Sequence, residues 1–258
     1  MSRYELIRRA SLSFLLVLLG WSLLTYTGIV KDFFLPTPTA VAKAMVALFI
    51  EQGFLKDVAM SVSRILIGFA IATVLGVPVG ILIGLNKQAE SFIEPMIDFI
   101  RYTPIPAFIP LFILWFGVGE LEKIIVIASS VFFQIVLMAA NSVSLTPKAL
   151  IESALTLGVT RWQVVTKVIY PFSRPRILDD LRVSMGWAWA VLTIAEIVGA
   201  TSGIGFVIIQ SQRLLQTARV MAAIIVVGCL GILSDALFKW LYRTYFPWAS
   251  RMGRYVDA

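Results

Sequence analysis

Long runs without a charged residue dominate this sequence. They are Ala10–Val30, Ile65–Asn86, Tyr102–Gly119, Ile124–Pro147, Val183–Gln212 (interrupted by Glu196) and Val220–Phe238 (interrupted by Asp235). A helix needs about 20 apolar residues to cross the roughly 30 Å hydrocarbon core of a bilayer. The runs therefore predict an all-α membrane protein with six transmembrane helices, which form one transmembrane domain over residues 1–258.

Two of these runs depart from a simple spanning helix. Three prolines between residues 104 and 110 crowd the start of the third run. The fifth run is too long for one span, and Gly199, Gly203 and Gly205 indicate where it breaks.

Composition excludes several kinds of chemistry. Hydrophobic residues make up 59% of the chain and charged residues 14%, whereas soluble domains have about 25% charged residues. With no His and only Cys229, the chain offers no imidazole base, no histidine zinc ligand and no disulfide framework. We predict no catalytic residue and no metal site, and expect Cys229 to be a buried, inert thiol.

The basic residues predict an orientation. If the N-terminus is cytoplasmic, fifteen of the 22 Lys and Arg residues fall in inner segments and seven, including Arg64 and Lys123, in outer segments. Cytoplasmic segments of membrane proteins are enriched in Lys and Arg, so both termini are predicted to be cytoplasmic. This bias also explains most of the net charge of +7 without a nucleic-acid partner.

An outer segment, residues 33–53, is predicted to form an extracytoplasmic interfacial helix. Thr37 is a suitable N-cap, Pro38 suits the first helical position, and Gly53 ends the pattern. The segment carries one apolar stripe, formed by Val41, Ala44, Met45, Leu48 and Phe49. Such a stripe suits the membrane interface, and packing on the outer rim of the bundle explains it equally well.

An inner segment, residues 146–176, carries the signals of two short helices. Thr146 is predicted to cap the first helix, with Pro147 at its first position, and Gly158 to end it in a left-handed conformation. Thr160 is predicted to cap the second helix through a capping box with Gln163.

The second of these helices has an amphipathic pattern. Its apolar face is predicted to contain Trp162, Val165, Val168 and Ile169, and Pro171 is expected to end it. Two capped helices that meet at a glycine corner form an elbow, and its apolar face favours docking with a partner.

The residues of this elbow resemble a known motif. Glu152-Ser153-Ala154, Gly158 and Ile169-Tyr170-Pro171 are similar to the "EAA…G…I-x-LP" loop of permease subunits from ATP-binding-cassette (ABC) importers. Stretches resembling the nitrate/sulfonate/taurine/bicarbonate branch are Leu35–Pro38, Pro104–Glu120 and Ala195–Gly205. The resemblance extends from about residue 33 to 243. The chain departs from the family pattern at Ser153, Tyr170 and the acidic pair Asp179-Asp180.

The resemblance implies a binding-protein-dependent type I importer in the bacterial inner membrane. It implies a homodimer of permeases, cytoplasmic ABC ATPase subunits that bind ATP and Mg, and an extracytoplasmic substrate-binding protein. The substrate would be a small anion or zwitterion. The ATPase-coupling residues would be Glu152, Ser153, Ala154, Gly158, Arg161, Trp162 and Pro171. The sequence has no Gly-Lys dipeptide and hence no phosphate-binding P-loop, so any ATP is expected on another chain.

Residues of the translocation path are less closely specified. A charge within the bilayer is costly and often functional, which points to Glu196; the alternative is a structural ion pair or a hydrogen bond to a broken helix. Gln134 and Asn141 are candidates at roughly helical spacing, although interhelical hydrogen bonds also explain them. Asp235 lies one helical turn before Lys239, which favours a simple ion pair.

Two other classes of protein remain as alternatives. A secondary transporter or channel would use Glu196 and Asp235 as ion or proton sites. A membrane-embedded enzyme would lack an obvious nucleophile, base or metal cluster. Neither class needs the elbow.

Overall fold

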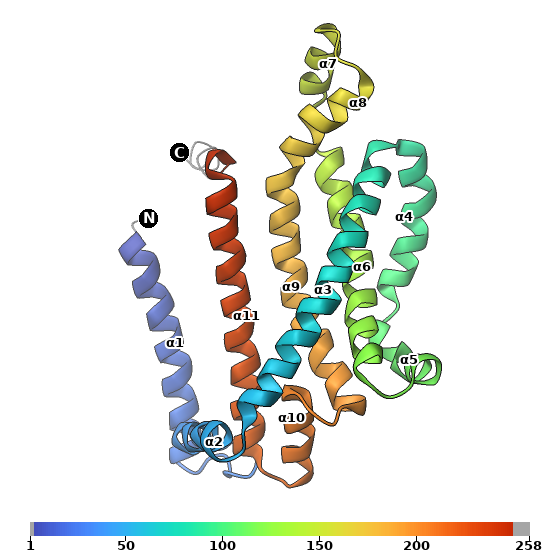
Figure 1. Ribbon diagram of the computed structural model, residues 1–258. Helices are drawn as coiled ribbons and strands as arrows, with labels where there is room; N and C mark the ends of the chain where they lie inside the picture. The colour runs from blue at the N-terminus through green and yellow to red at the C-terminus, as the bar shows by residue number, and fades with distance from the viewer. Residues whose placement is uncertain (1–2, 250–258) are drawn as a thin grey trace. The chain divides into compact units, whose positions relative to one another are not determined.

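The computed structural model describes residues 3–249, and these form helices and connecting turns with no strand. Figure 1 shows the helices in chain order. They are α1 (Arg3–Tyr26), α2 (Pro38–Glu51), α3 (Phe54–Leu85), α4 (Lys87–Tyr102), the 3-10 helix η1 (Ile105–Phe108), α5 (Ile109–Phe116), α6 (Glu120–Ser144), α7 (Lys148–Thr156), α8 (Arg161–Val164), the π-helix η2 (Val165–Ile169), α9 (Tyr170–Gly199), α10 (Ile204–Arg213) and α11 (Thr217–Tyr245). The all-α prediction is confirmed for this part of the chain.

Four helical stretches between residues 3 and 249 are long and apolar enough to cross a membrane. They are Phe54–Leu85, Glu120–Ser144, Arg161–Gly199 and Thr217–Tyr245. A fifth results if the bent pair Lys87–Ile100 and Ile105–Phe116 counts as one span. The six predicted spans are therefore not matched one for one, because the apolar part of α1, Ser11–Tyr26, is shorter.

The third and fifth predicted spans are both interrupted. Within 102–119 the backbone is extended at Thr103 and Pro104, and the helices on either side are bent by 69°. This run is therefore no single spanning helix, because Pro104 and the prolines that follow cannot continue the ladder of backbone hydrogen bonds. In the fifth run the predicted break is confirmed: α9 ends at Gly199, and α10 begins after Gly203, whose φ is 109°.

The chain divides into two compact units. Unit 1 comprises Met1–Met60 and Thr201–Gly228, and unit 2 comprises Ser61–Ala200 and Cys229–Ala258. The division falls within α3 and within α11. The predicted cytoplasmic C-terminus lies outside the described residues.

Unit 1 contains the predicted helix of segment 33–53, which is α2. The Thr37 side chain accepts a hydrogen bond from the Ala40 amide, Pro38 occupies the first turn, and Gly53 has a φ of 64°. Val41 and Leu48 of its apolar stripe are buried by protein. The helix and its cap are confirmed, and its side of the membrane stays a prediction.

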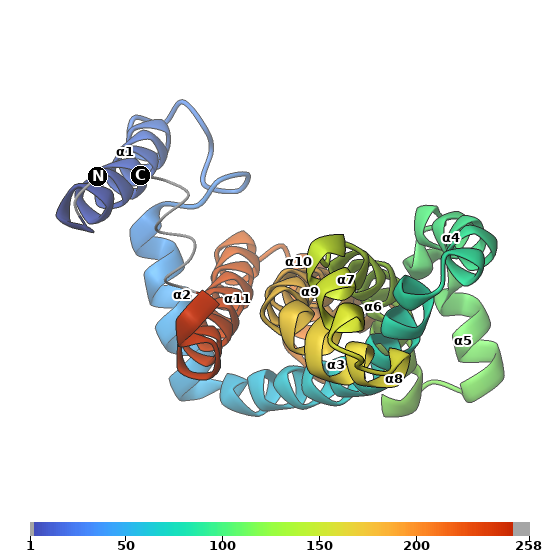
Figure 2. The same cartoon turned by 90° about the horizontal axis from the view of Figure 1, so that it is seen from above.

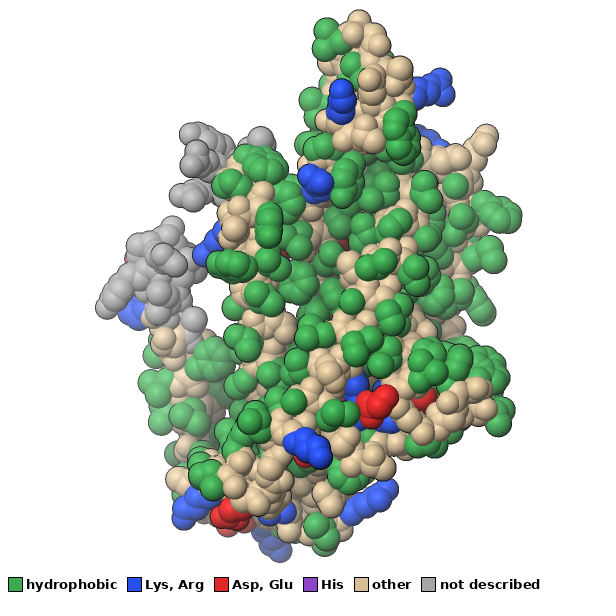
Figure 3. Space-filling model, in the orientation of Figure 1, with side chains coloured by type: hydrophobic (Ala, Val, Ile, Leu, Met, Phe, Trp, Pro, Cys, Tyr) green, Lys and Arg blue, Asp and Glu red, His purple; other side chains and the backbone are tan. Residues whose placement is uncertain are grey.

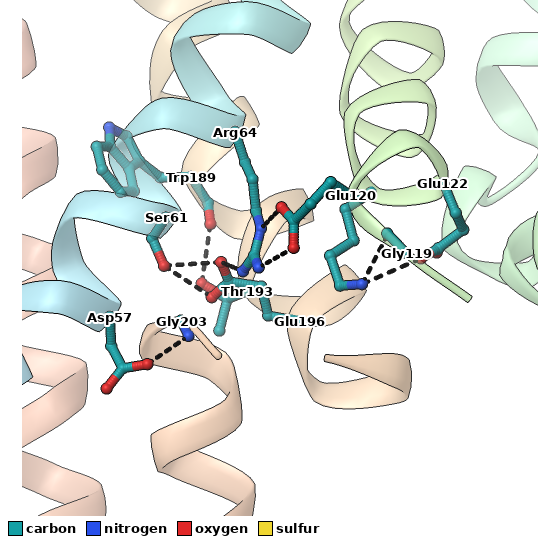
Figure 4. A network of polar contacts seen from close by, with 11 residues as sticks. Asp57, Ser61, Arg64, Gly119, Glu120, Glu122, Trp189, Thr193, Glu196 and Gly203 are labelled. Atoms are coloured by element: carbon teal, nitrogen blue, oxygen red, sulfur yellow. Dashed lines mark hydrogen bonds and ion pairs between the residues drawn. The ribbon is translucent and has the colours of Figure 1, made fainter. Parts of the chain in front are cut away.

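Two long-range hydrogen bonds fix the connections of unit 1. The Thr217 hydroxyl donates to the Phe33 carbonyl at 2.7 Å, which ties the start of α11 to the segment before α2. The Asp57 carboxylate accepts from the Gly203 amide at 2.7 Å and holds the turn before α10 (Figure 4).

Unit 2 has its core between α6 and α9, which run alongside each other (Figures 1 and 2). One buried cluster joins Val126 of α6 to Val191 and Ala195 of α9. Glycines let α3 approach α6 closely. A Cβ atom at Gly80 would meet the Val136 carbonyl, and one at Gly84 would meet the Ala140 carbonyl. Small residues at such contacts are typical of helix packing in membranes, where backbones can approach closely.

Large apolar side chains cover much of the surface that Figure 3 shows. Val74 and Leu82 of α3 and Ile232 and Leu233 of α11 are each more than half exposed. Cys229 is also exposed, so the expectation of a buried thiol is wrong. This residue lies on a face of α11 that the chain itself leaves uncovered, as expected for a lipid-facing helix.

Candidate functional site

The elbow formed by α7 and α8 projects beyond the ends of α6 and α9 (Figure 1). Its corner is Gly158, whose φ of 78° confirms the predicted left-handed stop. The capping box is also confirmed: the Thr160 amide donates to Gln163 Oε1 at 3.0 Å, and the Gln163 amide donates to Thr160 Oγ1. Both features depend on residues close together in the sequence, which is why the sequence indicates them.

Thr146 does not cap the first helix of the elbow. Its hydroxyl donates to the Val143 carbonyl at 2.8 Å, so the buried side chain closes the end of α6. Pro147 takes the N-cap position of α7 and makes no side-chain hydrogen bond there. The prediction was wrong because the Thr146 hydroxyl can bond either to the end of α6 or to the start of α7, and it bonds to the end of α6.

Pro171 does not end the second helix. The helical stretch continues from Arg161 to Gly199, because the π-helix Val165–Ile169 precedes the proline. In this wider turn the Tyr170 amide donates to the Val165 carbonyl, five residues earlier. A π-turn relieves the clash and the missing donor that a proline introduces in an α-helix.

One side of the elbow is anchored in unit 2. Ala154, Val164 and Ile169 form a buried cluster with Val143 at the end of α6. The predicted apolar face is therefore divided: Ile169 is buried in this cluster beside Val164, which was not part of the predicted face, whereas Trp162 is exposed. Ala154 is the one buried member of the predicted coupling set.

The other side of the elbow is open. The exposed fraction of Trp162 is 73% and that of Leu157 is 83%. Glu152, Ser153, Gly158 and Arg161 are also exposed, and Pro171 is half-buried. The Ser153 hydroxyl donates to the Ala149 carbonyl at 2.7 Å, so it is satisfied within its own helix. The elbow thus brings most of the predicted coupling residues to one exposed projection.

A network of ion pairs lies where α6 begins and α9 ends (Figure 4). Arg64 of α3 donates through Nε and Nη2 to both carboxylate oxygens of Glu120, at 2.5 and 2.6 Å. Its Nη1 donates to Glu196 Oε1 at 2.7 Å, and the Ser61 hydroxyl lies 2.7 Å from the same oxygen. One guanidinium therefore joins α3 to the beginning of α6 and to the end of α9.

Sequence reasoning placed Arg64 in an outer segment and missed this role. Since α3 begins at Phe54, Arg64 lies nearly three turns inside a helix, and its side chain is 1% exposed. The sequence offered one signal: Arg64 borders the apolar run that begins at residue 65. Its partners could not be read, because they lie 56 and 132 residues away.

Lys123 is also buried rather than free in an outer loop. Its Nζ donates to the Gly119 carbonyl at 2.8 Å and lies 3.6 Å from Glu122 Oε2. Glu122 is fully buried in the first turn of α6, where the helix dipole favours a negative charge. Glu122 was not predicted as a site residue.

Glu196 is paired, and its carboxylate is 1% exposed. The structural ion pair that was the alternative for this residue is therefore present, whereas a role in the path stays a prediction. Asp235 forms the expected pair with Lys239 at 2.7 Å, and Arg182 approaches it to 3.6 Å.

Gln134 and Asn141 line different cavities. Gln134 lines a cavity of about 350 Å³ between α6, α9 and the break after α4. Asn141 is exposed beside a cavity of about 270 Å³ that also borders Glu90, Glu94 and Asp98 of α4. The two predicted path residues are therefore not brought together. In the part of the chain that the structure describes, no group of three His, Cys, Asp or Glu side chains could hold a metal ion.

Comparison with known proteins identifies the family. The family model described as "Binding-protein-dependent transport system inner membrane component" matches residues 76–246. The chain belongs to this family. It is an integral inner-membrane permease, and the matched range includes the elbow and most of unit 2.

Relatives of the permease cover most of its length. The taurine transport system permease protein TauC of Escherichia coli (strain K12) is 32% identical over 95% of this chain and 92% of its own. A permease protein of Bacillus subtilis (strain 168) named for aliphatic sulfonates transport, SsuC, is 34% identical over 88% and 83%. The bicarbonate transport system permease protein CmpB of Synechococcus elongatus is 30% identical over 75% and 70%. The permease therefore belongs to the nitrate/sulfonate/taurine/bicarbonate branch of ABC importers.

Solved structures share the fold. An inward-facing MetNI methionine ABC transporter matches 74% of this chain and 95% of its own with a TM-score of 0.67, at 19% identity. An amino acid ABC transporter crystallised with histidines matches with a TM-score of 0.59, at 16% identity. At these identities the likeness shows the ABC importer permease fold alone.

Proposed function

We propose that this permease forms the translocation path of an ATP-driven importer for a small anion or zwitterion. Two copies would associate in the bacterial inner membrane with both termini in the cytoplasm. Cytoplasmic ABC ATPase subunits would bind ATP and Mg, and an extracytoplasmic binding protein would deliver the substrate. The permease itself would catalyse no reaction.

The elbow carries this proposal. Its inner side is fixed by the cluster around Val143, Ala154 and Ile169, while Trp162 stands exposed beyond the helix ends. An exposed tryptophan on a rigid projection is typical of a residue that a partner covers. Full burial of its 150–250 Å² would contribute about 2–4 kcal/mol to docking, since part of the transfer energy is lost in ordering the interface.

The relatives support the class of substrate. Their names refer to taurine, aliphatic sulfonates and bicarbonate, which are small and carry an anionic group. We propose a substrate of this class for the permease.

The ion pairs weaken the case for a secondary transporter. Such a transporter would need Glu196 and Asp235 to exchange ions or protons during transport. Each carboxylate has a cation within 2.7 Å in this structure, Arg64 and Lys239 respectively. Release of these partners would add a cost to every cycle.

Docking of the elbow is tested by substitution of its corner. Gly158→Val should misplace α7 and α8, since a β-branched residue strongly disfavours a φ of 78°. Gly158→Asn is the matched control, because asparagine tolerates this conformation better than other side chains. The measurements are co-purification of the ATPase and ATP hydrolysis stimulated by loaded binding protein in reconstituted vesicles.

A second pair of variants tests the exposed side. Trp162→Ala should weaken ATPase binding about thirtyfold or more, whereas Trp162→Phe should retain most of it. Glu152→Lys should weaken docking through charge reversal, and Glu152→Gln serves as its control. Undiminished co-purification and undiminished stimulated hydrolysis in Gly158→Val and Trp162→Ala would refute the proposed coupling.

A further inference from the structure

A cavity lies within unit 2, about half-way along α6. Its volume is about 350 Å³, which is within the range of small-molecule sites. Three parts of the chain line it: α6 with Ser130 and Gln134, α9 with Trp187 and Ile194, and the segment 102–106.

Ser130 brings a buried hydroxyl without a hydrogen-bond partner to this cavity. Its side chain is 8% exposed, and its hydroxyl has no hydrogen-bond partner. The adjacent Ser129 behaves differently, because its hydroxyl donates to the Ile125 carbonyl one turn earlier at 2.7 Å. Buried hydroxyl groups normally have a partner, so a ligand or water is expected beside Ser130. The Gln134 side-chain amide makes only a weak hydrogen bond, from its Nε2 to the Met138 sulfur at 3.8 Å.

The broken helix supplies a second, independent observation. The backbone of Thr103 and Pro104 is extended where the chain passes the middle of α6. Non-helical backbone at membrane depth is tolerated where it is buried in protein or lines a polar cavity. Segment 102–106, which contains this break, is itself part of the lining of the cavity.

The lining defines the chemistry of the ligand. None of its twelve described residues is charged, and its hydrogen-bonding side chains are neutral. Neutral donors would hold a sulfonate or carboxylate oxygen more weakly than a buried cation would. Weak binding suits a solute that must leave again. The walls formed by Phe133, Trp187 and Ile194 suit a hydrocarbon part.

We propose that this cavity is a transient binding subsite for a small organic oxyanion. Ser130 and Gln134 hydrogen-bond the oxyanion, and the apolar wall receives its carbon chain. The subsite favours an organic sulfonate or carboxylate over an inorganic anion such as nitrate. It rests on the proposed function, since it places the solute of the importer within the permease.

Cysteine protection tests the subsite directly. With Cys229 replaced by Ser the chain has no cysteine, and Ser130→Cys then introduces a single thiol. The full transporter, in nucleotide-free membrane vesicles, is treated with 2-sulfonatoethyl methanethiosulfonate, a thiol reagent that is itself a small organic sulfonate. At ten times its dissociation constant, 1-butanesulfonate should slow labelling about tenfold. Sodium nitrate at equal ionic strength should not, and Ser129→Cys should show no protection by either salt.

Contrary results are equally defined. Equal labelling of Ser130→Cys in butanesulfonate and nitrate would overturn the subsite, as would equal protection of Ser129→Cys. Gln134→Cys provides the same test if Ser130→Cys does not assemble, and absence of labelling in both variants also overturns it. Co-purification of the ATPase with the elbow variants is independent of these outcomes, so failure of the subsite is distinguishable from failure of the importer proposal.

Discussion

Removal of Arg64 should be the most damaging single change in the ion network. Its hydrogen bonds to Glu120 and Glu196 neutralise two carboxylates of different exposure: the Glu120 side chain is 50% exposed and Glu196 is 1% exposed. Water can replace the guanidinium at Glu120 but not at Glu196. Loss of one partner of a buried ion pair costs about 3–5 kcal/mol, so Arg64→Met should lower the free energy of unfolding by that amount.

The two carboxylates should respond differently. Glu196→Gln removes the buried negative charge, while Arg64 keeps its two-oxygen contact with Glu120; about 1–3 kcal/mol should be lost. Glu120→Gln should cost less than about 1 kcal/mol, because the pair lies partly in solvent. The double variant Arg64→Met/Glu196→Gln leaves no unpaired charge at Glu196. Its loss in free energy of unfolding should therefore be at least about 1 kcal/mol smaller than the sum of the losses in the two single variants.

Reversible unfolding in mixed detergent micelles, followed by tryptophan fluorescence, measures all four free energies. Additive costs in the double variant would refute the argument, as would an Arg64→Met cost no greater than that of Glu120→Gln. ATP-driven uptake by Glu196→Gln tests the remaining question. Lost uptake in a stable, ATPase-bound variant supports a path role, and uptake in proportion to folded protein supports a structural one.

Three further outcomes are expected. Gly84→Val should lower the free energy of unfolding by about 1–3 kcal/mol, because the valine side chain would meet the α6 backbone. Gly231 has open space around it, so Gly231→Val should change this free energy little. Unfolding in the same detergent micelles compares the two variants. Thr160→Ala should destabilise α8 by about 0.5–2 kcal/mol through loss of the cap, seen as faster amide hydrogen exchange confined to the elbow. In a cysteine-free background, Gln52→Cys should react with an impermeant thiol reagent from outside and Pro147→Cys should not; the reverse labelling would contradict the predicted orientation.

Features that depend on neighbours a few residues apart were predictable from the sequence. The Thr37 cap, the Thr160 capping box, the Gly158 corner and the break after Gly199 are of this kind. Each is decided by contacts over three or four residues, or by the freedom of one glycine. Tertiary packing did not override them.

Features that depend on distant contacts, or on a choice between two local arrangements, were not predictable. Arg64 was placed outside a span because the apolar run begins at residue 65. No nearby residue indicates that Glu120 and Glu196 are its partners. Pro171 was expected to end a helix, and a π-turn compensated for it. For Thr146 the choice between two flanking helices depended on the fold. Which apolar residues of the elbow pack within unit 2 was not predicted, since hydrophobicity alone does not distinguish Trp162 from Val164.

The unbroken helical stretch from Arg161 to Gly199 makes the elbow one arm of a lever. It runs through 39 residues, and Glu196 stands roughly 50 Å from the corner at a rise of 1.5 Å per residue. A tilt of about 5° about the elbow would carry Glu196 sideways by about 4–5 Å, more than the length of its bond to Arg64. The π-turn at Val165–Ile169 is the place in this helix where a bend would reduce the movement that reaches Glu196. A tilt of this size, if passed on without bending at the π-turn, would therefore lengthen the link between α3, α6 and α9 at the far end.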